Sequence, residues 1–189
     1  MKCLFLGYNR KQTRLINFLK RKKIKIINKK SKILIKDVVD KDIIISFGYR
    51  HLISKKIINR LKRPIINLHM SYLPYNKGAH PNFWSFIHKT KKGVTIHEIN
   101  EGIDAGKIIF QKKIKFNLSK NKKLSFKKTY NILFKELEKL FIKNYKFLIE
   151  NNYETKKNSK FLGKYNSRSE LPADLKNWNI NILSYLKNR

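Results

Sequence analysis

Apolar residues along the chain form two alternating patterns, short continuous runs and helix-like spacings. Residues 2–7 end on Gly7, and residues 43–47 are followed by Gly48; such runs are typical of strands buried on both faces. Other short apolar segments predict further strands, and spacings of three or four residues between them predict helices. The expected strands are 2–7, 24–27, 43–47, 64–66, 93–99 and 107–116, and the expected shorter helices are 11–21, 53–61 and 81–89.

The longest periodic segment predicts an amphipathic helix over residues 125–150, followed by a polar tail with scattered aromatics. The alternation of strands and helices predicts an α/β fold, with a Rossmann-like, mostly parallel twisted sheet flanked by helices. We expect a catalytic domain over 1–152 and a tail over 153–189 that packs on it or forms a homodimer contact. Only about 35 residues separate the first strand from 43–47, so a shortened helix-strand unit is expected at 24–42.

Net charge changes the picture only after it is divided along the chain. The 189 residues carry a net charge of +33, which first suggests a polyanionic partner. Residues 1–63 carry +17 and residues 112–189 carry +14, whereas residues 64–111 carry only +2. That neutral block holds three of the four prolines and four of the seven glycines. We therefore look for the chemistry in the block and treat the charge as a background field.

Several classes of protein do not fit the sequence. The single cysteine, Cys3, leaves no internal disulfide and suits a reducing compartment. No apolar run approaches the roughly 18 residues of a membrane span, so we expect a cytoplasmic protein without a membrane partner. The first strand is not followed by the glycine pattern of a dinucleotide site or by a phosphate-binding loop, and no metal site is expected.

Three polar residues follow predicted strands of this block and form a candidate site. Asn67 and His69 come after the strand 64–66, and Asp104 lies in the loop between 93–99 and 107–116. An amide and an imidazole can donate hydrogen bonds to a developing oxyanion, and a carboxylate can orient the imidazole. The trio suits acyl transfer to an amine. The residues alone also fit a structural interpretation, in which His69 is a loop histidine and Asn67 caps a turn.

The sequence around Asn67, His69 and Asp104 resembles that of the folate-dependent formyltransferase family. The resemblance rests on Asn67-Leu68-His69-Met70-Ser71-Tyr72-Leu73-Pro74, then Gly78, Gly93-Val94-Thr95-Ile96-His97 and Asp104-Ala105-Gly106. It covers roughly residues 1–116 and is most specific over 43–111. It implies that Asn67, His69 and Asp104 are catalytic, that protonated His69 and Asn67 bind the oxyanion, and that 10-formyltetrahydrofolate is the co-substrate. It also implies a pocket for the pterin ring that is formed largely by backbone groups, at Arg50, His51, Leu52, Ile53, Ile99, Asn100 and Ile103.

The acceptor amine is less strongly indicated. The segment 73–84 resembles the small sugar-type formyltransferases, which implies a nucleotide-linked amino sugar, such as a 4-amino-4,6-dideoxy sugar, as acceptor. The candidate contacts are Tyr8, Arg10, Tyr75, Lys77 and Trp84. The alternatives are formylation of glycinamide ribonucleotide or methionyl-tRNA, or a non-catalytic, basic nucleic-acid-binding protein. Basic runs are not interleaved with aromatics as in single-strand binders, so nucleic acid is the less favoured partner.

Overall fold

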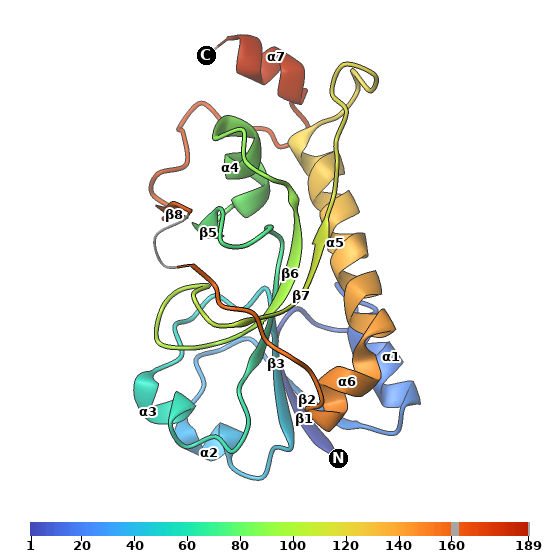
Figure 1. Cartoon of the computed structure of the whole chain (residues 1–189), viewed down its shortest axis with the longest axis vertical. Coiled ribbons are helices and arrows are strands. Elements are labelled where there is room, and N and C mark those ends of the chain that lie inside the picture. Colours follow the sequence, from blue (N-terminus) through green and yellow to red (C-terminus); the bar gives the residue numbers. More distant parts are fainter. Residues whose placement is uncertain (160–162, 189) are drawn as a thin grey trace.

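A six-stranded sheet forms the centre of the computed structural model, which describes residues 1–159 and 163–188. The strand order is β2-β1-β3-β4-β6-β7 (Figure 1). The first four strands in this order are parallel to one another. At one side of the sheet, β6 runs antiparallel to β4, and β7 runs antiparallel to β6. The predicted α/β fold with a mostly parallel sheet is therefore confirmed. The strands are β1 Lys2–Gly7, β2 Lys25–Lys29, β3 Ile43–Phe47, β4 Ile66–His69, β6 Gly93–Glu98 and β7 Ile108–Lys113.

Strand β1 explains why the sheet is covered on both faces. Cys3 and Phe5 enter one hydrophobic core with α1 and the long helix α5 (Phe126–Lys143), whereas Leu4 and Leu6 enter another core with α2 and α3. Alternate side chains of a strand point to opposite faces, so a continuous apolar run requires cover on both. The three short helices are α1 Leu15–Arg21, α2 Ile35–Val38 and α3 Lys55–Ile58.

The long predicted helix is present but broken. Helix α5 spans Phe126–Lys143, and α6 spans Tyr145–Glu150. Asn144 leaves the helical conformation, with φ −104° and ψ 13°, and its side-chain amide donates to the carbonyl of Leu140. The expectation of one helix over 125–150 was wrong at this residue, because an amide that bonds the preceding turn competes with the helical ladder.

Strand β4 lies further along the chain than the sequence predicts. The apolar run 64–66 ends before the pairing does, because β4 continues to His69 opposite the buried strand β6. Asn67 and His69 are therefore strand residues, not loop residues. They lie two positions apart, which directs both side chains to the same side of the sheet.

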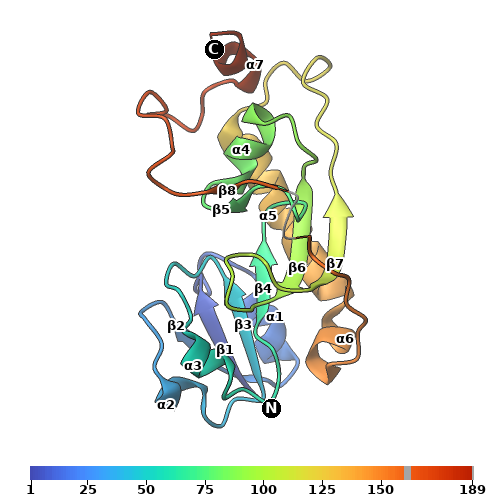
Figure 2. The same cartoon turned by 60° about the vertical axis from the view of Figure 1, so that its left-hand side comes forward.

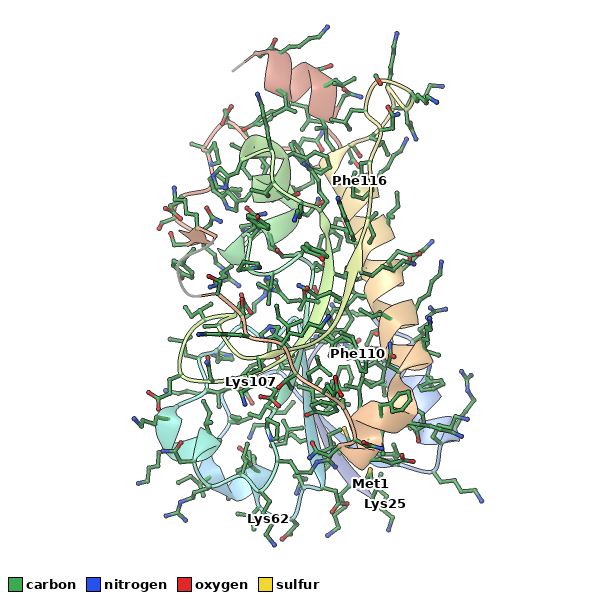
Figure 3. The ribbon with its side chains drawn as sticks, viewed as in Figure 1. Met1, Lys25, Lys62, Lys107, Phe110 and Phe116 are labelled. Carbon is green, nitrogen blue, oxygen red and sulfur yellow. The ribbon has the colours of Figure 1, made fainter. Side chains whose placement is uncertain are left out.

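The tail builds a second core with the central part of the chain. Strand β5 (Lys77–Gly78) pairs with β8 (Tyr165–Asn166), and helix α4 (Pro81–Ile87) packs under the tail helix α7 (Ile182–Lys187). Figure 2 shows the tail leaving α6 beside the sheet and, in its later part, reaching α7. Phe116, which follows β7, packs against both this core and the main one (Figure 3). Among the described residues, no helix is long and apolar enough to cross a membrane.

Candidate active site

Strands β4 and β6 and the loop after β6 bring the predicted trio together. Asn67 pairs in register with His97 on β6, and Asp104 returns from the following loop to face both. The Asn67 amide donates to Oδ1 of Asp104 at 3.2 Å, and Nδ1 of His69 lies 3.6 Å from Oδ2. The expected placement of the three side chains is therefore seen in the structure.

Asp104 is held in place from several directions. Its side chain is only 11% exposed, and Oδ2 accepts a hydrogen bond from the backbone N–H of Gly78 at 2.8 Å. Asn158 of the tail donates to the backbone carbonyls of Asp104 and Gly106, at 2.8 and 3.0 Å. A Cβ at Gly106 would overlap the carbonyl of Glu98, so only glycine fits the turn after the carboxylate.

His97 also belongs to this site, although the sequence did not indicate it as a candidate catalytic residue. It is 1% exposed, and its Nε2 lies 3.0 Å from the Asn67 amide and 3.4 Å from Oδ1 of Asp104. Its Nδ1 lies 2.7 Å from the Glu98 carbonyl, which can only accept, so this partner places a proton on Nδ1. The signal that could have found it is its register opposite Asn67.

Burial and charge set the protonation of the trio. Burial alone would raise the pKa of Asp104, but His69, His97 and the Gly78 N–H together hold that pKa well below its usual range. Burial lowers the pKa of His69, and the Asp104 charge opposes this only in part. Asp104 is therefore a carboxylate, burial and the Asp104 charge act on the pKa of His69 in opposite directions, and a protonated His69 stays a prediction.

The trio opens into a cavity of about 520 Å³, which we call cavity A. Two loops supply about half of its lining residues, one after β3 and one before Asp104. Two of its apolar residues are exposed, Leu52 by 75% and Ile103 by 39%. All seven residues expected at the pterin line this cavity, namely Arg50, His51, Leu52, Ile53, Ile99, Asn100 and Ile103.

A second cavity, cavity B, adjoins cavity A and has a volume of about 660 Å³. The two cavities share wall residues, among them Arg50, Met70, Pro81 and Arg168. The described lining of cavity B includes four lysines and arginines and no acidic residue. These four are Arg50, Lys127, Arg168 and Lys176, and the aromatic lining residues include Tyr8, Tyr130, His80 and Trp178.

The five expected acceptor contacts lie in different places. Tyr8 lines cavity B, where its hydroxyl lies 2.7 Å from that of Tyr130. Arg10 lines a separate hollow of about 280 Å³ beside α1 and β2. The other three, Tyr75, Lys77 and Trp84, line none of these cavities.

Local packing explains those three positions. Lys77 is 6% exposed, because its ammonium donates to the Ser159 carbonyl at 2.9 Å. Trp84 is 7% exposed and stacks on His88 in the second core. Tyr75 is half-buried, with the Lys91 ammonium 6.0 Å from its ring centroid. None of the three lines cavity A or cavity B, and their contact with the acceptor stays a prediction.

The tail supplies site residues that the sequence did not single out. Arg168, Lys176 and Trp178 line cavity B, and Arg168 and Tyr165 line cavity A. None of them belongs to a periodic segment or a motif, so their proximity to the trio depends on the β5–β8 pairing. In the described part of the chain, no cluster of three or more His, Cys, Asp or Glu side chains is arranged to hold a metal ion.

The sequence matches a family of known proteins. The family model described as Formyl transferase matches residues 16–130. Methionyl-tRNA formyltransferase of Finegoldia magna is 38% identical over 85 residues, which are 43% of this chain but only 27% of that protein. The chain thus matches about a quarter of the length of such curated relatives.

Solved structures match over much more of the chain. The formyltransferase PseJ from Anoxybacillus kamchatkensis, in complex with UDP-4,6-dideoxy-4-formamido-L-AltNAc and tetrahydrofolate, is 34% identical with a TM-score of 0.87. That match covers 97% of this chain and 96% of PseJ. A 4-N formyltransferase from Francisella tularensis is 25% identical with a TM-score of 0.74, over 89% of this chain and 76% of that one. The trio, its two adjoining cavities and these matches place the chain in the formyl transferase family.

Proposed function

We propose that this protein transfers a formyl group from 10-formyltetrahydrofolate to the primary amine of a nucleotide-linked amino sugar. The observation that carries the proposal is the convergence of Asn67, His69 and Asp104 in cavity A, directly beside the basic cavity B. One cavity suits the formyl donor and the other suits the acceptor. The reacting amine would then enter from cavity B toward the trio.

Cavity A has the properties of a site for the folate. Leu52 and Ile103 are exposed apolar side chains in its wall, and a flat aromatic ring system would cover them. About half of the remaining lining comes from the loops 48–53 and 99–104, whose backbone can hydrogen-bond a pterin edge. PseJ, which matches over nearly its whole length, was solved with tetrahydrofolate.

Cavity B has the properties of a site for a nucleotide sugar. Four basic residues and no acidic residue in its described lining favour a polyanion such as a diphosphate. Tyr8, Tyr130 and Trp178 offer flat surfaces for a base or a sugar ring. The likeness to PseJ and to a 4-N formyltransferase supports a 4-amino-4,6-dideoxy sugar as the acceptor.

The proposed chemistry assigns one role to each member of the trio. The folate supplies a formyl carbon that an uncharged amine can attack. Asn67 turns one amide N–H from its resting partner toward the formyl oxygen, and His69 donates a second hydrogen bond to the same oxygen. As the amine nitrogen bonds to the formyl carbon, its one surplus proton passes, directly or through water, to the His69–Asp104 pair, where the negative charge of Asp104 favours the protonated form of His69. The proton then passes to the departing folate nitrogen as its C–N bond breaks.

Methionyl-tRNA is the second candidate acceptor. It is favoured by the 38% identity with methionyl-tRNA formyltransferase and by the net charge of +33. Against it, the match covers only 27% of that enzyme, and the excess charge lies outside the block that holds the trio.

A product assay tests the proposal. The protein would be incubated with 10-formyltetrahydrofolate and a panel of UDP- and dTDP-linked amino sugars with the amine at different ring positions. Mass spectrometry is expected to find a formyl group on at least one 4-amino sugar and to locate it on nitrogen. A folded protein that formylates no member of the panel would overturn the proposed acceptor class.

A further inference from the structure

Two arginines stand on the wall that separates cavities A and B. Arg50 follows β3 and Arg168 follows β8, and they are the only charged residues that line both cavities in the described lining. Both side chains are exposed. Within residues 1–159 and 163–188, neither guanidinium group takes part in an ion pair or a hydrogen bond that the structure shows.

The two positive charges act on the same neighbour. Burial lowers the pKa of His80 in cavity B, and the charges of Arg168 and Arg50 lower it further. Nearby carboxylates have other partners, since Glu101 pairs with Lys55 at 2.9 Å and Glu170 with Lys164 at 3.8 Å. Two like charges that converge without a counter-ion repel each other, and a bound anion removes that repulsion.

Guanidinium groups select a particular kind of anion. Their planar donor pairs match phosphate oxygens bidentately, and two of them on one wall suit two adjacent phosphates. We propose that Arg50 and Arg168 form one clamp on the diphosphate of the acceptor, a proposal that rests on the proposed function. The clamp places the nucleotide in cavity B and directs the sugar amine toward cavity A.

The position of Arg168 gives the clamp a second consequence. Arg168 lies two residues beyond β8, β8 pairs with Lys77–Gly78 of β5, and the Gly78 N–H holds the Asp104 carboxylate. A diphosphate on Arg168 therefore fixes the tail strand that helps to position Asp104. It also fixes Tyr165 and Arg168 in the wall of cavity A. Occupation of the clamp then tightens the folate site as well.

Binding measurements with uridine 5′-diphosphate test the clamp. Titration calorimetry at fixed salt would compare the wild type with Arg50→Gln, Arg168→Gln and the control Arg60→Gln. Arg60 is exposed and lines neither cavity, so its loss changes the net charge equally. We expect each clamp variant to weaken binding about tenfold or more, as for a lost charge-assisted contact, and the control to stay within about twofold. Equal binding by all four proteins would overturn the clamp.

A second titration tests the coupling and the identity of the anion. In the wild type, saturating uridine diphosphate should tighten tetrahydrofolate binding several-fold, and in Arg168→Gln that gain should disappear. If Arg168→Gln instead weakens tetrahydrofolate alone and leaves uridine diphosphate unchanged, the arginine binds the folate carboxylates and the clamp is wrong. Product formation by the wild type tests the proposed function separately, so a failed clamp leaves that result standing.

Discussion

At the scale of single residues, Asp104 connects every part of the site. Its two oxygens contact Asn67, His69, His97 and the Gly78 N–H, and its backbone carbonyl accepts from the tail. A carboxylate with this many partners does more than balance one charge. In the proposed reaction it orients both hydrogen-bond donors to the formyl oxygen and stabilises the positive charge on His69.

The Asp104→Asn variant removes the negative charge of this side chain and keeps its shape. The amide keeps the size of the side chain, but it cannot stabilise a protonated His69 or accept the amine proton. We expect kcat to fall about 10²- to 10³-fold, as for loss of a main oxyanion interaction, while the far-ultraviolet circular dichroism spectrum is unchanged. His69→Ala should fall at least as far. The exposed Asp40→Asn change is the matched control and should turn over at the wild-type rate. Near-wild-type kcat in Asp104→Asn would contradict the assigned role.

His69 makes a prediction about stability and pH. Burial holds its pKa in the folded protein below the ordinary value of 6.5, so the unfolded chain binds protons more readily below pH 6.5. The free energy of unfolding should therefore fall as pH drops from about 7 to 5, by up to about 1.4 kcal/mol per pH unit for this group. Urea unfolding of His69→Gln should show a shallower fall. The slope retained by that variant comes from His80 and His88, whose pKa values burial also lowers. An identical slope in both proteins would exclude His69 as a source.

At the scale of elements, continuous apolar runs were the most informative pattern. The strands 2–7 and 43–47 appear with the predicted bounds. Both faces of each strand are buried, so a continuous apolar run marks the whole strand. Strand β4 was misplaced, since pairing with β6 carries it through the polar residues Asn67 and His69. The helix expected at 53–61 is reduced to the single turn of α3, where half-buried and exposed positions leave little face to pack.

The contact between the tail and the Asp104 loop yields an element-scale prediction. Asn158 is 5% exposed and donates to two carbonyls of this loop. Asn158→Ala would leave both carbonyls buried without that donor, at a cost of about 1–3 kcal/mol in the free energy of unfolding. We expect kcat to fall several-fold as the loop loosens. Asn152→Ala, at an exposed position just before, should change neither quantity. Unaltered stability and kcat in Asn158→Ala would show that the loop keeps its place without the tail.

At the scale of the whole molecule, the tail completes the fold. Leu175, Ile182 and Tyr185 pack with Phe83 and Phe126 in the second core. Ile182 is fully buried, so Ile182→Ala should cost about 2–5 kcal/mol of unfolding free energy, measured by chemical denaturation. Exposed Ile132→Ala, on α5, is the comparison and should cost far less. A small loss in Ile182→Ala would mean that the tail docks without contributing to stability.

The same scale shows what the sequence could and could not predict about the site. The trio and the 99–104 loop of cavity A lie in the nearly neutral block 64–111, and the other loop, 48–53, follows the predicted strand 43–47, so motif spacing and strand order place them together. Cavity B draws on Tyr8, Tyr130 and Arg168, which are separated by most of the chain and belong to no motif. Residue type alone indicated Trp84 and Lys77 as ligand contacts, and it did not predict that Trp84 packs in the second core or that Lys77 donates a buried hydrogen bond. Long-range packing, which sequence spacing does not reveal, determines which residues line cavity B.

The most direct test of the central claim is a competition between the two candidate acceptors. The protein would receive limiting 10-formyltetrahydrofolate with equal concentrations of a UDP-linked 4-amino-4,6-dideoxy sugar and initiator methionyl-tRNA, and mass spectrometry would locate the formyl group. We predict that it appears on the sugar nitrogen, that the methionyl amine remains free, and that Asp104→Asn strongly reduces the sugar product. Formyl groups found on methionyl-tRNA, with the sugar unmodified, would contradict the account.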